Sequence, residues 1–243
     1  MPALEYNPSE AIKTNIYGAE NVIKAAIANN VKKVIAISTD KAVSPSNLYG
    51  ATKLCFEKLF NAANNIVGDK ETKFCVLRYG NVFKSRGSVV PLFLEQSKNN
   101  KFTVTDKAMT RFNLTLENAI NFVLQCSYKM CGGEIFVPKL KSYNIIQLCN
   151  VINPNAEIEF TGIRPGEKLH EVMIPAEEIR NTTDMGSHFV IQPNHYWWNL
   201  SDFRKAIETK GKPVSGIQEY ASDSNTDWLD QDQIATLLAN LDF

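Results

Sequence analysis

The sequence predicts an α/β protein in which helices cover a parallel sheet. Apolar residues recur at helical spacing over 9–29 and again over 47–64. A short apolar run, typical of a buried strand, follows each helix at 34–37 and at 74–79. Because helix and strand alternate with short connections, we expect neighbouring strands to run parallel and to pack against their helices.

Local signals support each of these elements in turn. Pro8-Ser9 is a helix start signal, and the helix that it begins leads directly into the strand Val34 to Ile37. The next helix starts near Asn47, and the run "FCVLRY" over 74–79 forms the second strand.

The second half alternates less regularly. From about Asn181 the tail is polar, so His188 and His195 are interpreted as surface residues, and "HYWW" over 195–198 as core or interface. The elements expected beyond Asn81 are helices over 90–99, 115–126, 143–150 and 230–241, and strands over 102–105, 134–137 and 157–160.

Composition excludes several classes of protein. Lys plus Arg (26) equals Asp plus Glu (26), and no basic block suggests nucleic acid. The 5 cysteines are odd in number and lack metal-ligand spacing, so neither a metal site nor a disulfide framework is expected. The N-terminus does not resemble a signal peptide, and no apolar run reaches the ~18 residues of a membrane span. A cytoplasmic protein without a membrane partner is the expectation.

Polar residues follow both predicted strands at their carboxyl ends. Ser38 to Lys41 comes after the first strand, and Arg78 to Asn81 closes the second. Open parallel sheets bind ligands beyond the carboxyl ends of their strands. The pattern therefore predicts a single site between the two halves of the chain.

Tyr49 and Lys53 lie one helical turn apart, on the same face of the second helix. A lysine ammonium beside a phenol favours the phenolate, which could take a proton from a substrate hydroxyl. The spacing alone is a weak signal. A polar turn at a strand end followed by a solvated helix lysine remains an equally open interpretation.

Four segments extend this pattern over nearly the whole chain. "STDKAVSPSNLYGATKL" (38–54) resembles the active-site segment of the extended short-chain dehydrogenase/reductases, in particular the nucleotide-sugar 4,6-dehydratases. The pair Asp40-Lys41 is typical of the UDP-N-acetylglucosamine 4,6-dehydratases, and Tyr49 of their soluble, C5-inverting form in pseudaminic acid biosynthesis. The segments that agree in the same order are "EYNPSEAIKTNIYGAENVI", "LRYGNVFKSRGSVVPLF", "MTRFNLTLENAINFVL" and "GIRPGEKLHEVMI".

This resemblance implies a lyase that uses NADP and assigns a role to each polar residue. Tyr49 would take the proton of the sugar 4-hydroxyl, and Thr39 would orient that hydroxyl. Lys53 would bind the nicotinamide ribose and lower the pKa of Tyr49. Lys41 would remove the C5 proton, and Asp40 would protonate the departing 6-hydroxyl.

The resemblance also implies residues that bind the UDP-sugar. Arg86 and Arg164 are the candidates for the diphosphate, and Glu167 for the uridine ribose, with Asn81 and Arg111 as second choices. A structural ion pair between Arg111 and Glu167 is the alternative.

One departure from the family stands out. None of the 12 glycines forms the Gly-x-Gly of the cofactor loop, and the resemblance begins near Pro2, after the family's fourth strand. We therefore expect an N-terminally truncated Rossmann-like parallel sheet over 1–83. A smaller α/β substrate-binding lobe would occupy 84–243, with the helix 115–126 packing back on the first part.

Three explanations of this departure stay open: a fragment, one half of a split enzyme, or a shortened non-catalytic protein. The expected partner is accordingly a second copy in a homo-oligomer or a separate N-terminal half. Two other functions stay open beside the dehydratase. They are a non-catalytic UDP-sugar-binding module and a nucleotide-sugar 4-epimerase, for which Lys41 would have no role.

Overall fold

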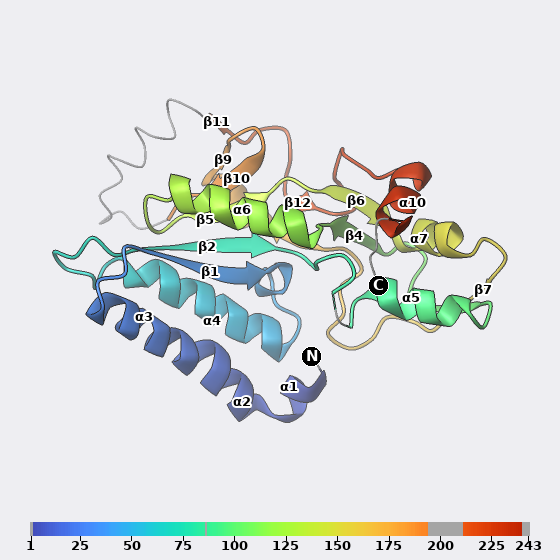
Figure 1. Ribbon diagram of the computed structural model, residues 1–243, viewed down its shortest axis with the longest axis horizontal. Helices are drawn as coiled ribbons and strands as arrows, with labels where there is room; N and C mark the ends of the chain where they lie inside the picture. Colours follow the sequence, from blue (N-terminus) through green and yellow to red (C-terminus); the bar gives the residue numbers. More distant parts are fainter. Residues whose placement is uncertain (1, 86, 194–210, 240–243) are drawn as a thin grey trace. The chain divides into compact units, whose positions relative to one another are not determined.

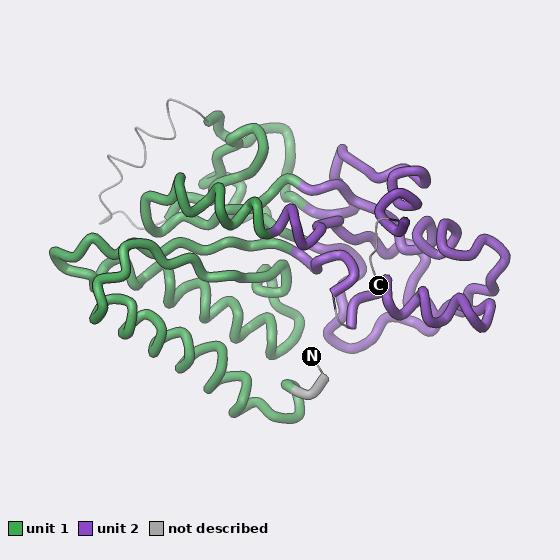
Figure 2. The backbone as a smooth tube through the Cα atoms, in the orientation of Figure 1, with its two compact units in different colours: residues 1–79, 120–139, 172–220 green, residues 80–119, 140–171, 221–243 purple. Residues whose placement is uncertain are grey.

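The computed structural model describes residues 2–85, 87–193 and 211–239 (Figure 1). Its chain divides into two compact units (Figure 2). Unit 1 comprises Met1–Tyr79, Ile120–Lys139 and Val172–Tyr220. Unit 2 comprises Gly80–Ala119, Leu140–Glu171 and Ala221–Phe243.

In the described part of unit 1, six strands form one sheet, of which one half is parallel and the other antiparallel. β1, β2 and β5 run parallel to one another, and β10 pairs antiparallel with both β5 and β9. In sheet order the strands are β1 (Lys33–Thr39), β2 (Lys73–Tyr79), β5 (Ile135–Pro138), β10 (His188–Ile191), β9 (Thr182–Asp184) and β11 (Lys212–Pro213).

The pairing of β1 with β2 confirms that the two predicted strands are parallel neighbours. Ser38 lies opposite Arg78, and Thr39 lies opposite Tyr79 at the carboxyl edge. The polar residues that follow β1 therefore lie at the edge where a Rossmann-like sheet binds its ligands.

Helices cover both faces of this sheet. Figure 1 shows α3 and α4 on one face and α6 on the other. The predicted helix over 9–29 is interrupted by one π-helical turn, η1 (Lys13–Tyr17). The helices of this part of the chain are α1 (Pro2–Tyr6), α2 (Pro8–Ile12), α3 (Gly18–Ala28), the 3-10 turn η2 (Asp40–Ala42), α4 (Leu48–Ala63), α6 (Leu116–Lys129) and α8 (Ala176–Ile179).

The core of unit 1 corrects one expectation. The segment 188–191 is not a polar tail, because β10 lies inside the sheet and all four of its residues are buried. His188 is only 2% exposed, and its ring lies against Phe122 and Phe136. The apolar run after His188 was the signal for a strand. His195 and the rest of "HYWW" lie outside the described residues.

Unit 2 contains two small sheets packed with helices around an apolar core. β3 (Lys101–Val104) pairs parallel with β7 (Glu157–Phe160), and β4 (Thr110–Asn113) pairs antiparallel with β6 (Lys141–Asn144). The core includes Phe93 of α5 (Val89–Ser97), Leu148 of α7 (Ile145–Ile152) and Ile234 of α10 (Gln231–Ala239). Two short strands, β8 (Val172–Ile174) and β12 (Tyr220–Ala221), lie near the ends of unit 1 segments.

The structure divides the chain differently from the simple boundary expected at residue 83. The chain returns to unit 1 twice, over Ile120–Lys139 and over Val172–Tyr220. The reason is strand pairing, because β5 joins β2 and β10 joins β5 in one sheet. No helix among the described residues is both long and apolar enough to span a bilayer.

Candidate active site

The segment after β1 is held in place by two local caps. Thr39 precedes η2, and its hydroxyl accepts a hydrogen bond from the backbone N–H of Lys41 at 3.4 Å. Asn47 precedes α4, and its side chain accepts a hydrogen bond from Gly50 N–H at 2.8 Å. These caps satisfy backbone donors that a helix start leaves unpaired.

Gly50 allows α4 to approach η2 closely. A Cβ atom on Gly50 would overlap the carbonyl oxygen of Lys41, so no larger residue fits without a shift of the backbone. Tyr49 comes immediately before this contact. The glycine therefore brings Tyr49 close to Asp40 and Lys41, which both act on its ionisation.

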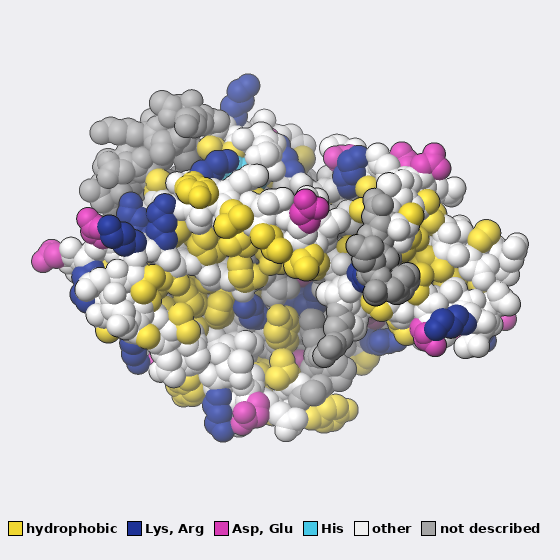
Figure 3. All heavy atoms as spheres, in the orientation of Figure 1, with side chains coloured by type: hydrophobic (Ala, Val, Ile, Leu, Met, Phe, Trp, Pro, Cys, Tyr) yellow, Lys and Arg dark blue, Asp and Glu magenta, His cyan; other side chains and the backbone are white. Residues whose placement is uncertain are grey.

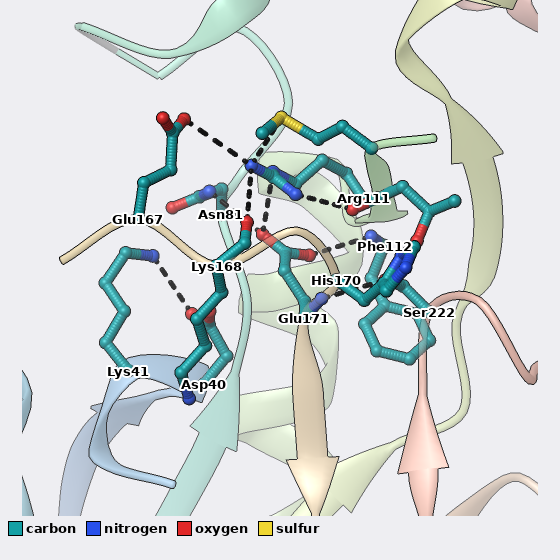
Figure 4. A network of polar contacts seen from close by, with 12 residues as sticks. Asp40, Lys41, Asn81, Arg111, Phe112, Glu167, Lys168, His170, Glu171 and Ser222 are labelled. Atoms are coloured by element: carbon teal, nitrogen blue, oxygen red, sulfur yellow. Dashed lines mark hydrogen bonds and ion pairs between the residues drawn. The ribbon is translucent and has the colours of Figure 1, made fainter. Parts of the chain in front are cut away.

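Asp40 is the centre of a small polar cluster at the carboxyl end of β1. The Thr39 hydroxyl donates to Asp40 Oδ1 at 2.9 Å, and Lys41 Nζ donates to the same oxygen at 3.1 Å. Figure 4 shows the Asp40–Lys41 pair. The Asp40 side chain is 4% exposed and that of Lys41 is 19% exposed. An acid and a base in direct contact are thus largely screened from water.

The pKa of Tyr49 depends on its burial and on two neighbouring charges. Burial raises the pKa of the Tyr49 phenol, Lys41 opposes this rise and Asp40 adds to it. Lys41 is therefore a cation that favours the Tyr49 phenolate in this structure.

Lys53 is not a solvated helix lysine. It is 8% exposed, its Nζ donates to the carbonyl oxygen of Ile37 at 2.7 Å, and it lies 3.6 Å from the centre of the Phe56 ring. Burial lowers the pKa of Lys53 to about 8, against the opposing effect of Glu57. Lys53 thus lies in α4 with its ammonium group buried against β1, and a buried lysine of this kind favours the functional interpretation over a solvated helix lysine.

A second polar network lies in unit 2 (Figure 4). Its centre is Glu171, which is 3% exposed and which residue types and spacing alone did not identify. The Glu171 carboxylate accepts hydrogen bonds from Asn81 Nδ2 at 3.0 Å and from the backbone N–H of Phe112 at 2.8 Å. The distance from Glu171 Oε1 to Arg111 Nε is 3.8 Å. In the sequence, a charged residue directly before the apolar run 172–174 was the available signal for this carboxylate.

Arg111 is held mainly by backbone carbonyl oxygens. Its Nη1 donates to Thr110 at 2.7 Å and to Leu169 at 3.0 Å, and its Nη2 donates to Lys168 at 3.3 Å. The distance from Arg111 Nη2 to Glu167 Oε1 is 3.8 Å. These contacts favour a structural role for Arg111 beside any contact with a substrate.

The two candidates for binding the diphosphate are Arg164 and Arg86. Arg164 is exposed and lies in a tight turn, in which Glu167 N–H donates to the Arg164 carbonyl at 3.0 Å and Gly166 has a positive φ of 74°. Arg86 lies outside the described residues. All the catalytic candidates thus belong to unit 1, and the described substrate candidates belong to unit 2.

The resemblance implies that Tyr49 and the buried Lys53 contact the nicotinamide ribose. The diphosphate needs a glycine-rich turn between a strand and a helix. In the described part of unit 1, the strand-to-helix connections at 40–47 and at 175 contain no glycine. The described residues also hold no group of three His, Cys, Asp or Glu side chains suited to a metal ion.

Comparison with known proteins identifies relatives of the whole chain. The inverting UDP-N-acetylglucosamine 4,6-dehydratase of Campylobacter jejuni subsp. jejuni serotype O:23/36 (strain 81-176) is 47% identical over 242 residues, which are 98% of this chain and 72% of that protein. The UDP-glucose 4-epimerase of Rickettsia bellii (strain OSU 85-389) is 40% identical over 248 residues, covering 100% of this chain and 72% of that protein.

Solved structures confirm the predicted Rossmann-like α/β class. The X-ray structure of Pen from Bacillus thuringiensis matches with a TM-score of 0.83 and 37% identity, covering 98% of this chain and 71% of that one. TunA, an NAD-dependent NDP-hexosamine 5,6-dehydratase, matches with a TM-score of 0.61, 14% identity and coverage of 99% and 74%, and at this identity it shows the fold alone. A family model described as polysaccharide biosynthesis protein matches residues 1–193. The chain therefore belongs to the polysaccharide biosynthesis protein family.

Proposed function

We propose that this chain carries the catalytic residues of an inverting UDP-N-acetylglucosamine 4,6-dehydratase. The observation that carries the proposal is the contact of Asp40 with Lys41 at 3.1 Å, at the carboxyl end of β1 and beside Tyr49. An elimination of water needs both a base and an acid close together, and this pair supplies them. The 47% identity to the Campylobacter enzyme of that name supports the same conclusion.

The first task of the site is to deprotonate the 4-hydroxyl of the sugar. Tyr49 is the proposed base, and Thr39 orients the hydroxyl. Burial raises the pKa of Tyr49, so the phenol is protonated at neutral pH until a nearby cation favours the phenolate. Lys41 is the cation that already acts in this direction. A nicotinamide cofactor, proposed as NADP, would accept the hydride from C4 and return it to C6.

The second task is to eliminate water across C5 and C6. A ketone at C4 acidifies the C5 proton, which Lys41 accepts in its neutral form. Asp40 in its protonated form donates to the departing 6-hydroxyl. The two side chains meet at Asp40 Oδ1, which places the acid and the base side by side. Return of a proton to the opposite face of C5 gives the inverted 4-keto-6-deoxy sugar.

The nucleotide would be held by residues of unit 2. Arg164 and Arg86 are proposed for the diphosphate, since a planar guanidinium binds two phosphate oxygens at once. Glu167 is proposed for the uridine ribose. Asn81 and Arg111 are the weaker candidates, because both are engaged by hydrogen bonds within unit 2.

The test is a product assay with UDP-N-acetylglucosamine and NADP+. Mass spectrometry should find a product lighter by one water, and NMR should find the inverted configuration at C5. Lys41→Met should abolish water loss, whereas Lys24→Met, at a lysine of α3 whose side chain is 71% exposed, should leave it unchanged. Water loss that persists in the Lys41→Met variant would contradict the assignment of the base.

A 4-epimerase is the second candidate, because the Rickettsia relative of that name is 40% identical over the whole chain. An epimerase needs neither a base at C5 nor an acid at the 6-hydroxyl, so Asp40 and Lys41 would have no chemical role. Conversion of UDP-glucose to UDP-galactose without loss of water, and equally fast in the Lys41→Met variant, would establish the epimerase instead.

A non-catalytic UDP-sugar-binding module is the third candidate. The observation that favours it is the absence of a glycine-rich turn from the described strand-to-helix connections of unit 1. Calorimetric titration separates it from both enzymes. A module would bind UDP and fail to bind NADP+.

A further inference from the structure

The helix α4 is joined to the parallel pair of strands by two buried contacts, one helical turn apart. Lys53 donates from Nζ to the carbonyl oxygen of Ile37 in β1 at 2.7 Å. One turn later, Glu57 accepts two hydrogen bonds from Arg78 in β2. Arg78 pairs with Ser38 in the sheet register, so the two strand contacts lie at neighbouring positions. Together they fix one stretch of α4 to both strands.

Lys53 and Glu57 are spaced so that they could pair with each other. Residues four apart lie on one face of a helix, and opposite charges at this spacing attract. In the structure, however, Lys53 binds a backbone carbonyl and Glu57 binds Arg78. Arg78 Nε and Nη2 contact the two carboxylate oxygens of Glu57 at 3.0 and 2.6 Å. Because a bidentate contact of this kind is strong and directional, Glu57 is held on Arg78 rather than on Lys53.

Arg78 uses each N–H group of its guanidinium within unit 1. Besides the two bonds to Glu57, Arg78 Nη1 donates to the Met173 carbonyl at 3.0 Å and to Glu178 at 2.6 Å. Arg78 Nη2 also donates to Glu178, at 3.4 Å. These contacts account for all the donors of an arginine side chain. Arg78 therefore affects the site through Glu57 and not through contact with a ligand.

Burial makes the charges of this group act strongly on one another. Figure 3 shows Lys and Arg side chains at the surface, where water screens their charges. By contrast, the side chains of Glu57 and Arg78 are each 1% exposed, and Lys53 is 8% exposed. Burial lowers the pKa of Lys53 to about 8, and Glu57 is the charge that opposes this shift. The position of the Glu57 carboxylate therefore matters for the charge that Lys53 retains.

We propose that Arg78 is a positioning residue for Lys53. By holding both oxygens of Glu57, Arg78 prevents an ion pair between Glu57 and Lys53 and leaves the Lys53 ammonium on the Ile37 carbonyl. Glu57 remains close enough to favour the charged form of Lys53 without binding it. An ammonium group has more donors than the one that Ile37 occupies, so the others can bind hydroxyl groups of a ligand near the carboxyl end of β1.

The use of those donors for the ribose of a nicotinamide cofactor rests on the proposed function, whereas the positioning of Lys53 does not. The alternative is that the Arg78–Glu57 pair only stabilises the interior, as many buried ion pairs do. Loss of either partner would then loosen α4 and let water reach Lys53. In that case the pKa of Lys53 would rise toward its ordinary value in both variants. Positioning predicts opposite changes for the two substitutions.

The test is an NMR titration of the lysine side-chain nitrogens in the full 243-residue chain, with Lys53→Met to assign the signal. In the parent, Lys53 should titrate with a pKa of about 8. Arg78→Met releases Glu57 to pair with Lys53, so the pKa of Lys53 should rise by about 1. Glu57→Gln removes the carboxylate, so this pKa should fall by about 1. A Lys53 signal that titrates in the parent like an exposed lysine, near ~10.4, would overturn the proposal.

Two further variants keep the result interpretable. Lys58→Gln is the matched control, because Lys58 is an exposed charged residue of α4 next to Glu57, and it should leave the pKa of Lys53 unchanged. The double variant Glu57→Gln/Arg78→Met removes both charges of the buried pair, which is better tolerated than the loss of one. It decides the matter if a single variant fails to fold by circular dichroism. In the double variant, the pKa of Lys53 should lie at or below that of the parent, because no carboxylate is released.

A rise in the pKa of Lys53 in folded Glu57→Gln or in the double variant overturns the proposal, and so does an unchanged pKa in folded Arg78→Met. Turnover is a separate readout. If the parent dehydrates UDP-N-acetylglucosamine, Arg78→Met should raise the KM for NADP+ more than it lowers kcat, since Lys53 is expected at the ribose. If the parent shows no dehydration but the pKa changes have the expected signs, the positioning stands and the proposed function fails.

Discussion

Arg78 and Glu57 form a bidentate ion pair in the interior of unit 1. Arg78 Nε donates to Glu57 Oε1 at 3.0 Å, and Arg78 Nη2 donates to Glu57 Oε2 at 2.6 Å. Both side chains are 1% exposed. Arg78 Nη1 also donates to Glu178 at 2.6 Å and to the carbonyl of Met173 at 3.0 Å. Burial disfavours the Arg78 charge, but the two carboxylates outweigh it and raise its pKa.

Removing one partner of this pair should be strongly destabilising. Glu57→Ala leaves the Arg78 charge buried with less compensation, so we expect a loss of about 3–5 kcal/mol in the free energy of unfolding. Glu178→Ala should cost less, because that side chain is 24% exposed and water can replace it in part. Urea denaturation of the two variants measures the difference. Equal losses would mean that burial does not govern the strength of these pairs.

Glu134 should make the protein less stable as the pH rises. The residue is fully buried, and burial raises its pKa to about 7, despite hydrogen bonds from the backbone N–H groups of Cys131 and Gly132. A carboxyl whose pKa is raised in the folded state contributes stability below its unfolded pKa, and this contribution is lost as the pH rises through the folded value. Glu134→Gln should therefore gain about 3 kcal/mol relative to the parent above pH 7.

The control for Glu134→Gln is Glu71→Gln, because the side chain of Glu71 is 80% exposed. Urea denaturation at a series of pH values should show no gain for the control. The prediction would be contradicted if the free energy of unfolding of Glu134→Gln changed with pH in the same way as that of the parent from pH 4.5 to pH 8.

His188 should have the opposite pH dependence. Burial lowers its pKa to about 4, with Lys129 as a further cause. A histidine whose pKa is lowered in the folded state contributes stability above its unfolded pKa of ~6.5, and this is lost as the pH falls toward the folded value. The effects of Glu134 and His188 on the free energy of unfolding therefore offset each other between about pH 4.5 and 6.5. In the Glu134→Gln variant, stability should fall more steeply than in the parent as the pH falls through this range. NMR titration of the His188 ring checks the pKa directly.

Gly50→Ala should disturb the catalytic segment. The new Cβ would overlap the Lys41 carbonyl and push α4 away from η2, so we expect a loss of stability of about 1–3 kcal/mol and a loss of dehydration. Gly18→Ala is a control of opposite sign, since its Cβ would meet only an ordinary contact at 3.5 Å within a helix. That variant should be about 1 kcal/mol more stable. Gly50→Ala with unchanged stability and turnover would show that the segment can adapt.

Lys41 should control the ionisation of Tyr49 more strongly than Lys53 does. Lys41→Met removes the cation that opposes the raised pKa of Tyr49, so this pKa should rise further. Lys53→Met should have a smaller effect, because Lys53 is engaged with the Ile37 carbonyl and the Phe56 ring. NMR titration of labelled tyrosine in each variant measures both shifts. A larger change in Lys53→Met would restore the role that the resemblance implied.

Most elements of the fold were predictable because each is encoded by neighbouring residues. The periodic helix over 47–64 and the run over 74–79 appear as α4 and β2, with boundaries within one residue. The misses are of another kind. β4 and β6 are four-residue strands whose existence depends on their partners, and so they have no local signal strong enough to predict them.

Some residues of the candidate site were predictable from the sequence, and others were not. Residue types and spacing identified Thr39, Asp40, Lys41, Tyr49 and Lys53 as candidates. They did not identify Glu171, whose importance lies in its burial and in its partners Asn81 and Phe112. They also could not show which lysine acts on Tyr49, because electrostatic effects depend on distance and burial rather than on spacing along the chain.

The sequence by itself determined the α/β class, the parallel pair of strands and the chemical identity of the residues at their carboxyl ends, because periodicity and residue type are local properties. Only the tertiary structure decided that His188 is core, that Lys53 is buried, and that β1 and α6 leave apolar surface uncovered. Burial is a property of what packs against a side chain, and the packing partners lie far apart in the sequence.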